Sequence, residues 1–125
     1  MLGNEAQAAT PAILLSPVSA ANTAAATGGW VDVRQAEGDI MVQAQVGALT
    51  GSITWTLQTA SDGSGTGATG ITPNEGAFAA GAANQVQKRT LSANATLGWI
   101  RLVGTIVTGP ALVAGTAAFR TPHAG

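Results

Sequence analysis

Hydrophobic and polar residues alternate with a period of two along most of the chain. In one run, Ile53, Trp55 and Leu57 alternate with hydroxyl and amide side chains, and residues 40–46 follow the same rule. Successive side chains of a strand point to opposite faces, so this pattern predicts strands with one buried and one hydrated face. Residues 99–108 are apolar or β-branched on both sides, which predicts a central strand covered on both faces.

Glycine, proline, asparagine and aspartate interrupt the alternating runs and mark the turns between strands. Short strands at intervals of about eight to twelve residues are typical of all-β sandwiches and barrels. We therefore predict an all-β fold, an antiparallel β-sandwich of the jelly-roll type, because about eight strands is the jelly-roll number. A seven-stranded immunoglobulin-like sandwich is the alternative. The strands are expected at residues 12–19, 29–36, 39–47, 51–60, 76–80, 85–92, 97–108 and 111–119.

Helices are not expected in this chain. The alanine-rich pieces 20–26 and 77–83 are short and lack an apolar stripe of helical period, so loops or single turns fit them better. The glycine- and serine-rich run 61–70 is predicted to be a mobile surface loop. The chain divides into an extended N-terminal arm with the first strand at 1–28, a β-sandwich domain at 29–120, and a C-terminal tail at 121–125.

The N-terminal segment does not have the pattern of a secretory signal. No Lys or Arg occurs in residues 1–33, and the apolar run from Ala12 to Leu15 is bracketed by Pro11 and Pro17. A signal peptide needs a cationic start and an unbroken apolar run, and no stretch approaches the ~20 residues of a membrane span. No membrane partner is therefore expected.

The composition is poor in charge. Only 9% of the 125 residues are charged, against roughly 25% in typical proteins, and five basic and six acidic side chains give a net charge of −1. Without a basic field, nucleic acid is not an expected partner. The chain has no cysteine, which excludes disulfides and thiol chemistry. So few charges suit a surface covered by partners; a GC-rich genome that favours Ala and Gly codons is the alternative explanation.

The sequence offers no constellation for catalysis. His123, the single histidine, lies in the C-terminal tail, where a rigid support is lacking. Asp32, Glu37 and Asp39 offer oxygen ligands to calcium if the fold joins them, but turns also require such residues. The run 62–67 lacks the lysine of a phosphate-binding loop. We expect no enzyme activity, no catalytic residue, no metal and no cofactor.

The three tryptophans are the most informative large side chains. Trp55 alternates with apolar residues of its strand and is predicted to be buried. Trp30 and Trp99 each begin a strand, and Arg34 and Arg101 follow within a few positions. Tryptophan beside arginine is typical of protein interfaces. Packing at a core edge and a platform for sugar rings are the alternatives for the first and last tryptophans.

Three longer segments share an order of elements. They are GGWVDVRQAEGDIMVQAQVGA ending at Ala48, GSITWTLQTASDGSGTG from Gly51 to Gly67, and GWIRLVGTIVTGPALVAGTAAF from Gly98 to Phe119. The order is a strand, an Asp-Gly-Ser loop, and an aromatic-x-Arg strand that ends in Thr-Gly. In this order the chain resembles small virion proteins of tailed bacteriophages, in particular the capsid decoration, or cement, proteins of jelly-roll type. The N-terminal arm departs from that pattern.

The resemblance implies a structural protein of the virion, made in the host cytoplasm and bound to the outer capsid surface. Such a protein bridges major capsid proteins as a homodimer or homotrimer and opposes the pressure of packaged DNA. Other virion positions, in the tail, neck or fibre, are the alternative, and a carbohydrate-binding module is a further rival. Protein contacts are expected along the arm and at the strand starts, at Ile13, Leu14, Leu15, Val18, Trp30, Arg34, Trp99 and Arg101.

Overall fold

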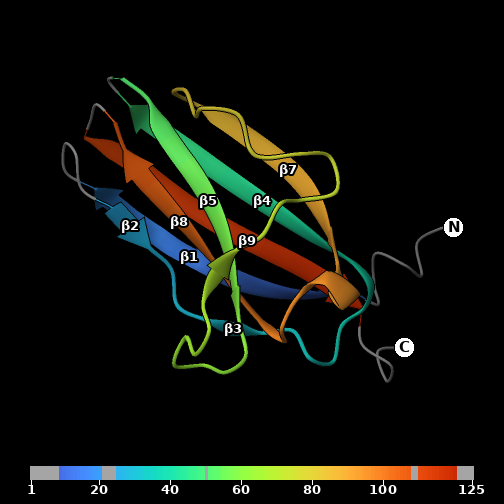
Figure 1. Ribbon diagram of the computed structural model, residues 1–125. Helices are drawn as coiled ribbons and strands as arrows, with labels where there is room; N and C mark the ends of the chain where they lie inside the picture. The colour runs from blue at the N-terminus through green and yellow to red at the C-terminus, as the bar shows by residue number, and fades with distance from the viewer. Residues whose placement is uncertain (1–8, 21–24, 50, 108–109, 121–125) are drawn as a thin grey trace, which may run out of the picture.

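Two antiparallel β-sheets stack face to face (Figure 1). The structure, a computed structural model, describes residues 9–20, 25–49, 51–107 and 110–120, without the side chains of residues 9–11 and 16–20. This arrangement confirms the all-β sandwich that the alternating pattern predicts. In the described part of the chain, no helix is long and apolar enough to cross a membrane.

Each sheet is built from strands that are distant in sequence. The first sheet has the order β1-β9-β4-β7. Its strands are β1 (Ala9–Ala20), β4 (Glu37–Leu49), β7 (Gln85–Ser92) and β9 (Ala111–Arg120). The second sheet has the order β2-β8-β5-β6, with β3 also paired to β8. Its strands are β2 (Ala25–Thr27), β3 (Val31–Asp32), β5 (Ile53–Ala60), β6 (Thr69–Gly70) and β8 (Trp99–Ile106).

The connections follow the jelly-roll order. β2 and β3 pair with successive parts of the same edge of β8, so they form one strand interrupted at residues 28–30. Counted in this way, the nine strands found in the described residues become eight, four in each sheet. Each of the first four then has its hydrogen-bonded partner among the last four, as in a double Greek key. This confirms the jelly-roll topology and the strand number expected for it.

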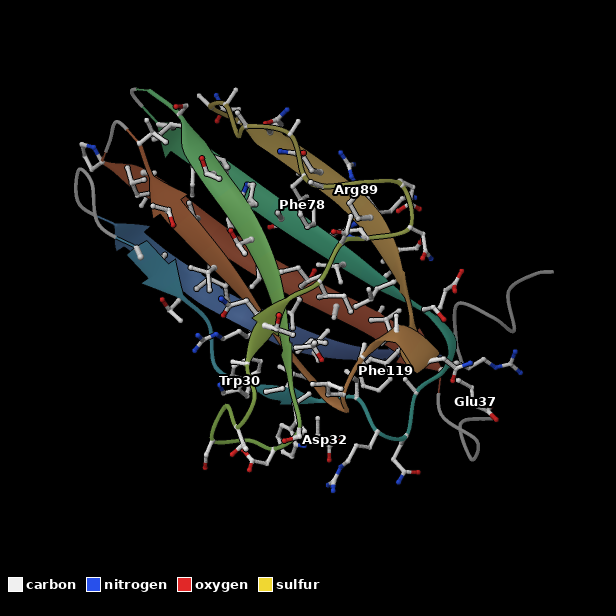
Figure 2. All side chains as sticks on the ribbon, viewed as in Figure 1. Trp30, Asp32, Glu37, Phe78, Arg89 and Phe119 are labelled. Atoms are coloured by element: carbon white, nitrogen blue, oxygen red, sulfur yellow. The ribbon has the colours of Figure 1, made fainter. Side chains whose placement is uncertain are left out.

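Several boundaries differ from the sequence prediction. The strand predicted at residues 76–80 does not form. This segment is irregular and lies at the side of the sandwich next to β7. There Gln87 bonds both backbone groups of Ala79, each at 2.9 Å, and Arg89 lies over Phe78 at 5.4 Å from the ring centroid (Figure 2). The expected strand 29–36 shrinks to β3, and β2 forms where a loop was predicted. A single-turn 3-10 helix, η1 (Ala93–Ala95), precedes β8.

The core lies between the two sheets. Trp55 is 5% exposed, which confirms its predicted burial. Leu102, at the centre of β8, is fully buried and reaches the other sheet, where a Cβ on Gly115 would stand 2.5 Å from its Cδ2 atom. β8 is central, as predicted. Within this chain its outer face is left uncovered, since Trp99 is half-buried and Thr105 is exposed there, so cover of this face by a partner stays a prediction.

β1 is the edge strand of the first sheet and pairs with β9 along its length. Between Ile13 and Leu15 the register advances two residues on β1 and one on β9, which is a β-bulge. The bulge explains why the neighbours Leu14 and Leu15 are both buried in the core. An edge strand tolerates Pro11 and Pro17, because not every N–H on it needs a partner strand. Residues 1–8 of the predicted arm lie outside the described residues.

Candidate functional site

Two tryptophan–arginine pairs meet on the outer side of the second sheet, where β3 joins β8. The guanidinium carbon of Arg101 lies 4.4 Å from the ring centroid of Trp30, and that of Arg34 lies 5.3 Å from the ring centroid of Trp99. Both distances are typical of cation–π contacts. Each arginine therefore lies over the tryptophan that is distant from it in sequence. The structure brings these four predicted interface residues together, and we call them the tryptophan–arginine cluster.

Strand register places the residues of the cluster. Alternation along β8 puts Trp99 and Arg101 on the same outer face, and the pairing of β3 with β8 sets Asp32 opposite Trp99. On the other side of β8, Gln58 of β5 is opposite Arg101 and accepts a 2.6 Å hydrogen bond from its Nε. This bond holds the guanidinium beside Trp30, which Figure 2 shows close to β3.

Asp32 orients the second arginine. The Nε and Nη2 atoms of Arg34 donate to the two carboxylate oxygens of Asp32 at 2.9 and 2.8 Å, and its backbone N–H donates to Oδ1 at 2.9 Å. The hydrogen bond from the Arg34 side chain lowers the pKa of Asp32 below its ordinary value. The Arg34 side chain is 62% exposed. An already oriented guanidinium thus remains accessible to a partner.

The loop after β5 is closed by its own hydrogen bonds. The Asp62 carboxylate accepts bonds from the backbone N–H of Ser64 at 2.9 Å and of Thr66 at 3.1 Å, and from the Thr66 hydroxyl at 2.6 Å. The backbone and hydroxyl of Ser61 both donate to the Thr66 carbonyl at 3.0 Å. The glycine-rich run predicted to be a mobile loop therefore has a defined shape.

The closed loop supports both tryptophan rings. A Cβ on Gly63 would lie 3.1 Å from the ring of Trp99, and one on Gly65 would lie 2.9 Å from Nε1 of Trp30. Gly65 also has a positive φ of 85°, which favours glycine. Glycine is needed at these positions because the loop backbone contacts the rings. Each ring thus carries a guanidinium and touches a glycine, which leaves less free surface for stacking a sugar.

We expect acid to loosen this loop. The hydrogen bond from the Thr66 side chain is the largest of the contacts that lower the pKa of Asp62 below the ordinary 3.8. A carboxyl whose pKa is lowered by folding stabilises the fold above its ordinary pKa, and this stabilisation is lost as pH falls through the lowered value. Tryptophan fluorescence should therefore change below about pH 4. The change should be smaller in Asp62→Asn, because the amide does not titrate; identical titrations of the two proteins would contradict this role.

An open pocket of about 350 Å³ adjoins the cluster. It lies between the turn after β3 and the connection from η1 to β8, and Arg34 lines it together with Val33 and Leu97. Leu97 is 52% exposed. Because Arg34 belongs to both features, the pocket and the cluster form one continuous surface with apolar and cationic groups.

The predicted contacts in β1 belong to the other sheet. Ile13 is 62% exposed, whereas the Leu14 and Leu15 side chains are buried within this chain and do not face a neighbour. Val18 lies opposite Val113, and its side chain is outside the description. A contact of β1 with a partner stays a prediction, with Ile13 as the side chain that is exposed for it.

The described side chains of the site are two guanidinium–indole pairs and the groups that hold them. In residues 9–20, 25–49, 51–107 and 110–120, no group of three or more His, Asp or Glu side chains could hold a metal ion. Asp32 is engaged by Arg34, and His123 is outside the described residues. Sequence reasoning missed Gln58, the glycine contacts and Leu97. Comparison with known protein families finds no model that matches this chain, and none of the curated proteins matches it.

Proposed function

We propose that this protein is a structural virion component that decorates a bacteriophage capsid and stabilises it by bridging major capsid proteins. The observation that carries the proposal is the tryptophan–arginine cluster. Trp30, Arg34, Trp99 and Arg101 form a single surface group, and tryptophan and arginine are the residues most enriched at the energetic centres of protein interfaces.

The order of the cluster supports a binding role. Gln58 holds Arg101 and Asp32 holds Arg34, so neither long side chain must be fixed at the moment of association. Ordering such side chains costs about 0.5–1.5 kcal/mol each on binding, and a preformed surface avoids that cost. Repeated over a capsid lattice, bridging contacts of modest strength give strong overall retention.

The topology and the surface charge are consistent with the same proposal. A jelly-roll is the fold that the resemblance to capsid decoration proteins implies, although this fold alone supports many functions. The low charge of the chain, 9% of its residues, suits a protein whose surface is covered by partners. A tail, neck or fibre position uses the same kind of contact and is the second candidate.

Binding to capsids tests the proposal. Purified full-length protein is incubated with capsids assembled from the major capsid protein of the same genome, and bound protein is measured by co-sedimentation. We expect saturable binding, and Arg34→Ala should weaken it by at least about tenfold, as for a moderate interface centre.

The matched control is Arg120→Ala, which removes an exposed cation from the end of β9 in the other sheet. It should leave capsid binding unchanged. Equal binding of the two variants would contradict the role of the cluster, and no binding of the wild-type protein to capsids would contradict decoration. Binding to isolated tails in place of capsids would favour the second candidate.

A further inference from the structure

The middle of the outer face of the β1-β9-β4-β7 sheet is almost free of charge. The outward positions 41–47 of β4 and 112–118 of β9 carry only Gln, Thr, Ala, Gly, Met and Leu, and Lys88 of the edge strand β7 is the one charged side chain described in these rows. The exposed Glu37, Asp39 and Arg120 lie at one end of the sheet, outside these rows. Ile13 and Leu112 are 62% and 49% exposed on the same face. We call this surface the neutral face.

The edges of this sheet are closed to further strands. β1 carries two prolines and two register shifts, both of which oppose pairing with another strand. At the other edge, Asn74 donates its N–H to the Thr90 carbonyl at 2.8 Å, and the Glu75 carboxylate accepts the Thr90 N–H at 2.7 Å. These features oppose association through the edge strands of this sheet, whereas its neutral face is open to a partner.

The polar groups of the neutral face are self-complementary, so this face can pair with the same face of a second copy. At its centre Gln43 accepts 3.5 Å hydrogen bonds from Gln45 and Thr116. An amide or hydroxyl both donates and accepts, so these groups can pair with the same groups of a second copy across a two-fold axis. The tryptophan–arginine cluster lacks this property, because two copies would set guanidinium against guanidinium.

The size of the face is enough for a modest interface. The neutral face spans four strands of about seven residues each. With about 4.8 Å between strands and about 3.3 Å between residues, its flat area is roughly 450 Å². Two copies then bury roughly 900 Å² in total, counted as flat area. Side chains that project from the face increase this area towards ~1,200 Å², the lower bound for stable complexes. Dissociation on dilution to the micromolar range is expected of such a contact.

We infer that the protein forms a two-fold symmetric homodimer through the neutral face. The inference deepens the proposed function and rests on it in one respect, namely that the second sheet binds the capsid through the tryptophan–arginine cluster. Packing of the first sheets against each other leaves both tryptophan–arginine clusters on the outside of the dimer. The two clusters then point in opposite directions, so one of them can face a capsid while the other stays free.

Light scattering after size exclusion tests the dimer without any capsid. At tens of micromolar the wild-type protein should have twice the monomer mass of 12.3 kDa. Ala114→Arg places a charge at the centre of the neutral face and should give monomer, whereas Thr56→Arg, an outward position of β5, should remain dimeric. Unchanged circular dichroism checks that both variants are folded. A monomeric or trimeric wild type, or a dimeric Ala114→Arg, would overturn the inference.

Single cysteines give an independent test, because the natural chain has none. Thr116→Cys lies near the expected axis and should form a covalent dimer within minutes under mild oxidant, at least about tenfold faster than Thr56→Cys. Equal rates would overturn the inference. Because this test uses no capsid, its failure leaves the capsid-binding result intact, and a dimer that does not bind capsids would contradict only the proposed function.

Discussion

Replacing Gly28 by alanine should lower the free energy of unfolding by about 3 kcal/mol or more, or prevent folding. Gly28 is buried between β1 and β8, where its N–H donates to the Leu102 carbonyl at 3.0 Å. A Cβ there would stand 1.7 Å from the carbonyl oxygen of Leu14. Because that atom is backbone, relief requires β1 to move away from the second sheet. Urea denaturation followed by circular dichroism measures the loss.

The adjacent glycine provides the control. A Cβ on Gly29 meets no atom within 4 Å, and the residue is exposed. Gly29→Ala should therefore change the free energy of unfolding by less than about 0.5 kcal/mol. If the two alanine variants were equally stable, the close approach of β1 to residue 28 would be contradicted.

Leu102→Ala is expected to lower the free energy of unfolding by about 3 kcal/mol. Leu102 is fully buried at the centre of the sandwich and contacts the other sheet near Gly115. Its loss removes apolar burial and leaves a cavity in a site walled by two sheets, which can collapse only in part. The measurement is again the urea midpoint, with the slope checked for a two-state transition.

Val103 is the matched control in the same strand. Its side chain is half-buried on the outer face of β8, where neither sheet of the described residues covers it. Val103→Ala should lower the free energy of unfolding by about 1 kcal/mol or less. A larger loss at Val103 than at Leu102 would contradict the assignment of inner and outer faces along β8.

Much of the fold was predictable, because one face of most strands is buried. Period-two alternation locates β4, β5, β7, β8 and β9 to within a few residues. It failed at 76–80, where the apolar Phe78 closes the side of the sandwich from an irregular segment and not from a strand. It also failed for β2, whose three residues are too few to alternate and whose Ala26 is buried opposite Gly104. The double burial of Leu14 and Leu15 depends on a bulge, which alternation does not predict.

The candidate site was predictable in its residue types but not in its geometry. Tryptophan beside arginine singled out all four residues of the cluster, yet each arginine lies over the tryptophan that is distant from it in sequence. That exchange depends on the register between β3 and β8, which local sequence does not contain. Composition alone favours mobility at Gly63 and Gly65. Their function is close contact with the rings, which becomes visible only when distant strands are placed side by side.

Electron cryomicroscopy of capsids incubated with the full-length protein tests the proposed function most directly. The account predicts jelly-roll density at symmetry-related positions on the outer surface, with the loop 61–68 and Trp30, Arg34, Trp99 and Arg101 facing the major capsid protein. Capsids that stay bare at saturating protein, or density in which the neutral face contacts the shell and the cluster points to solvent, would contradict it.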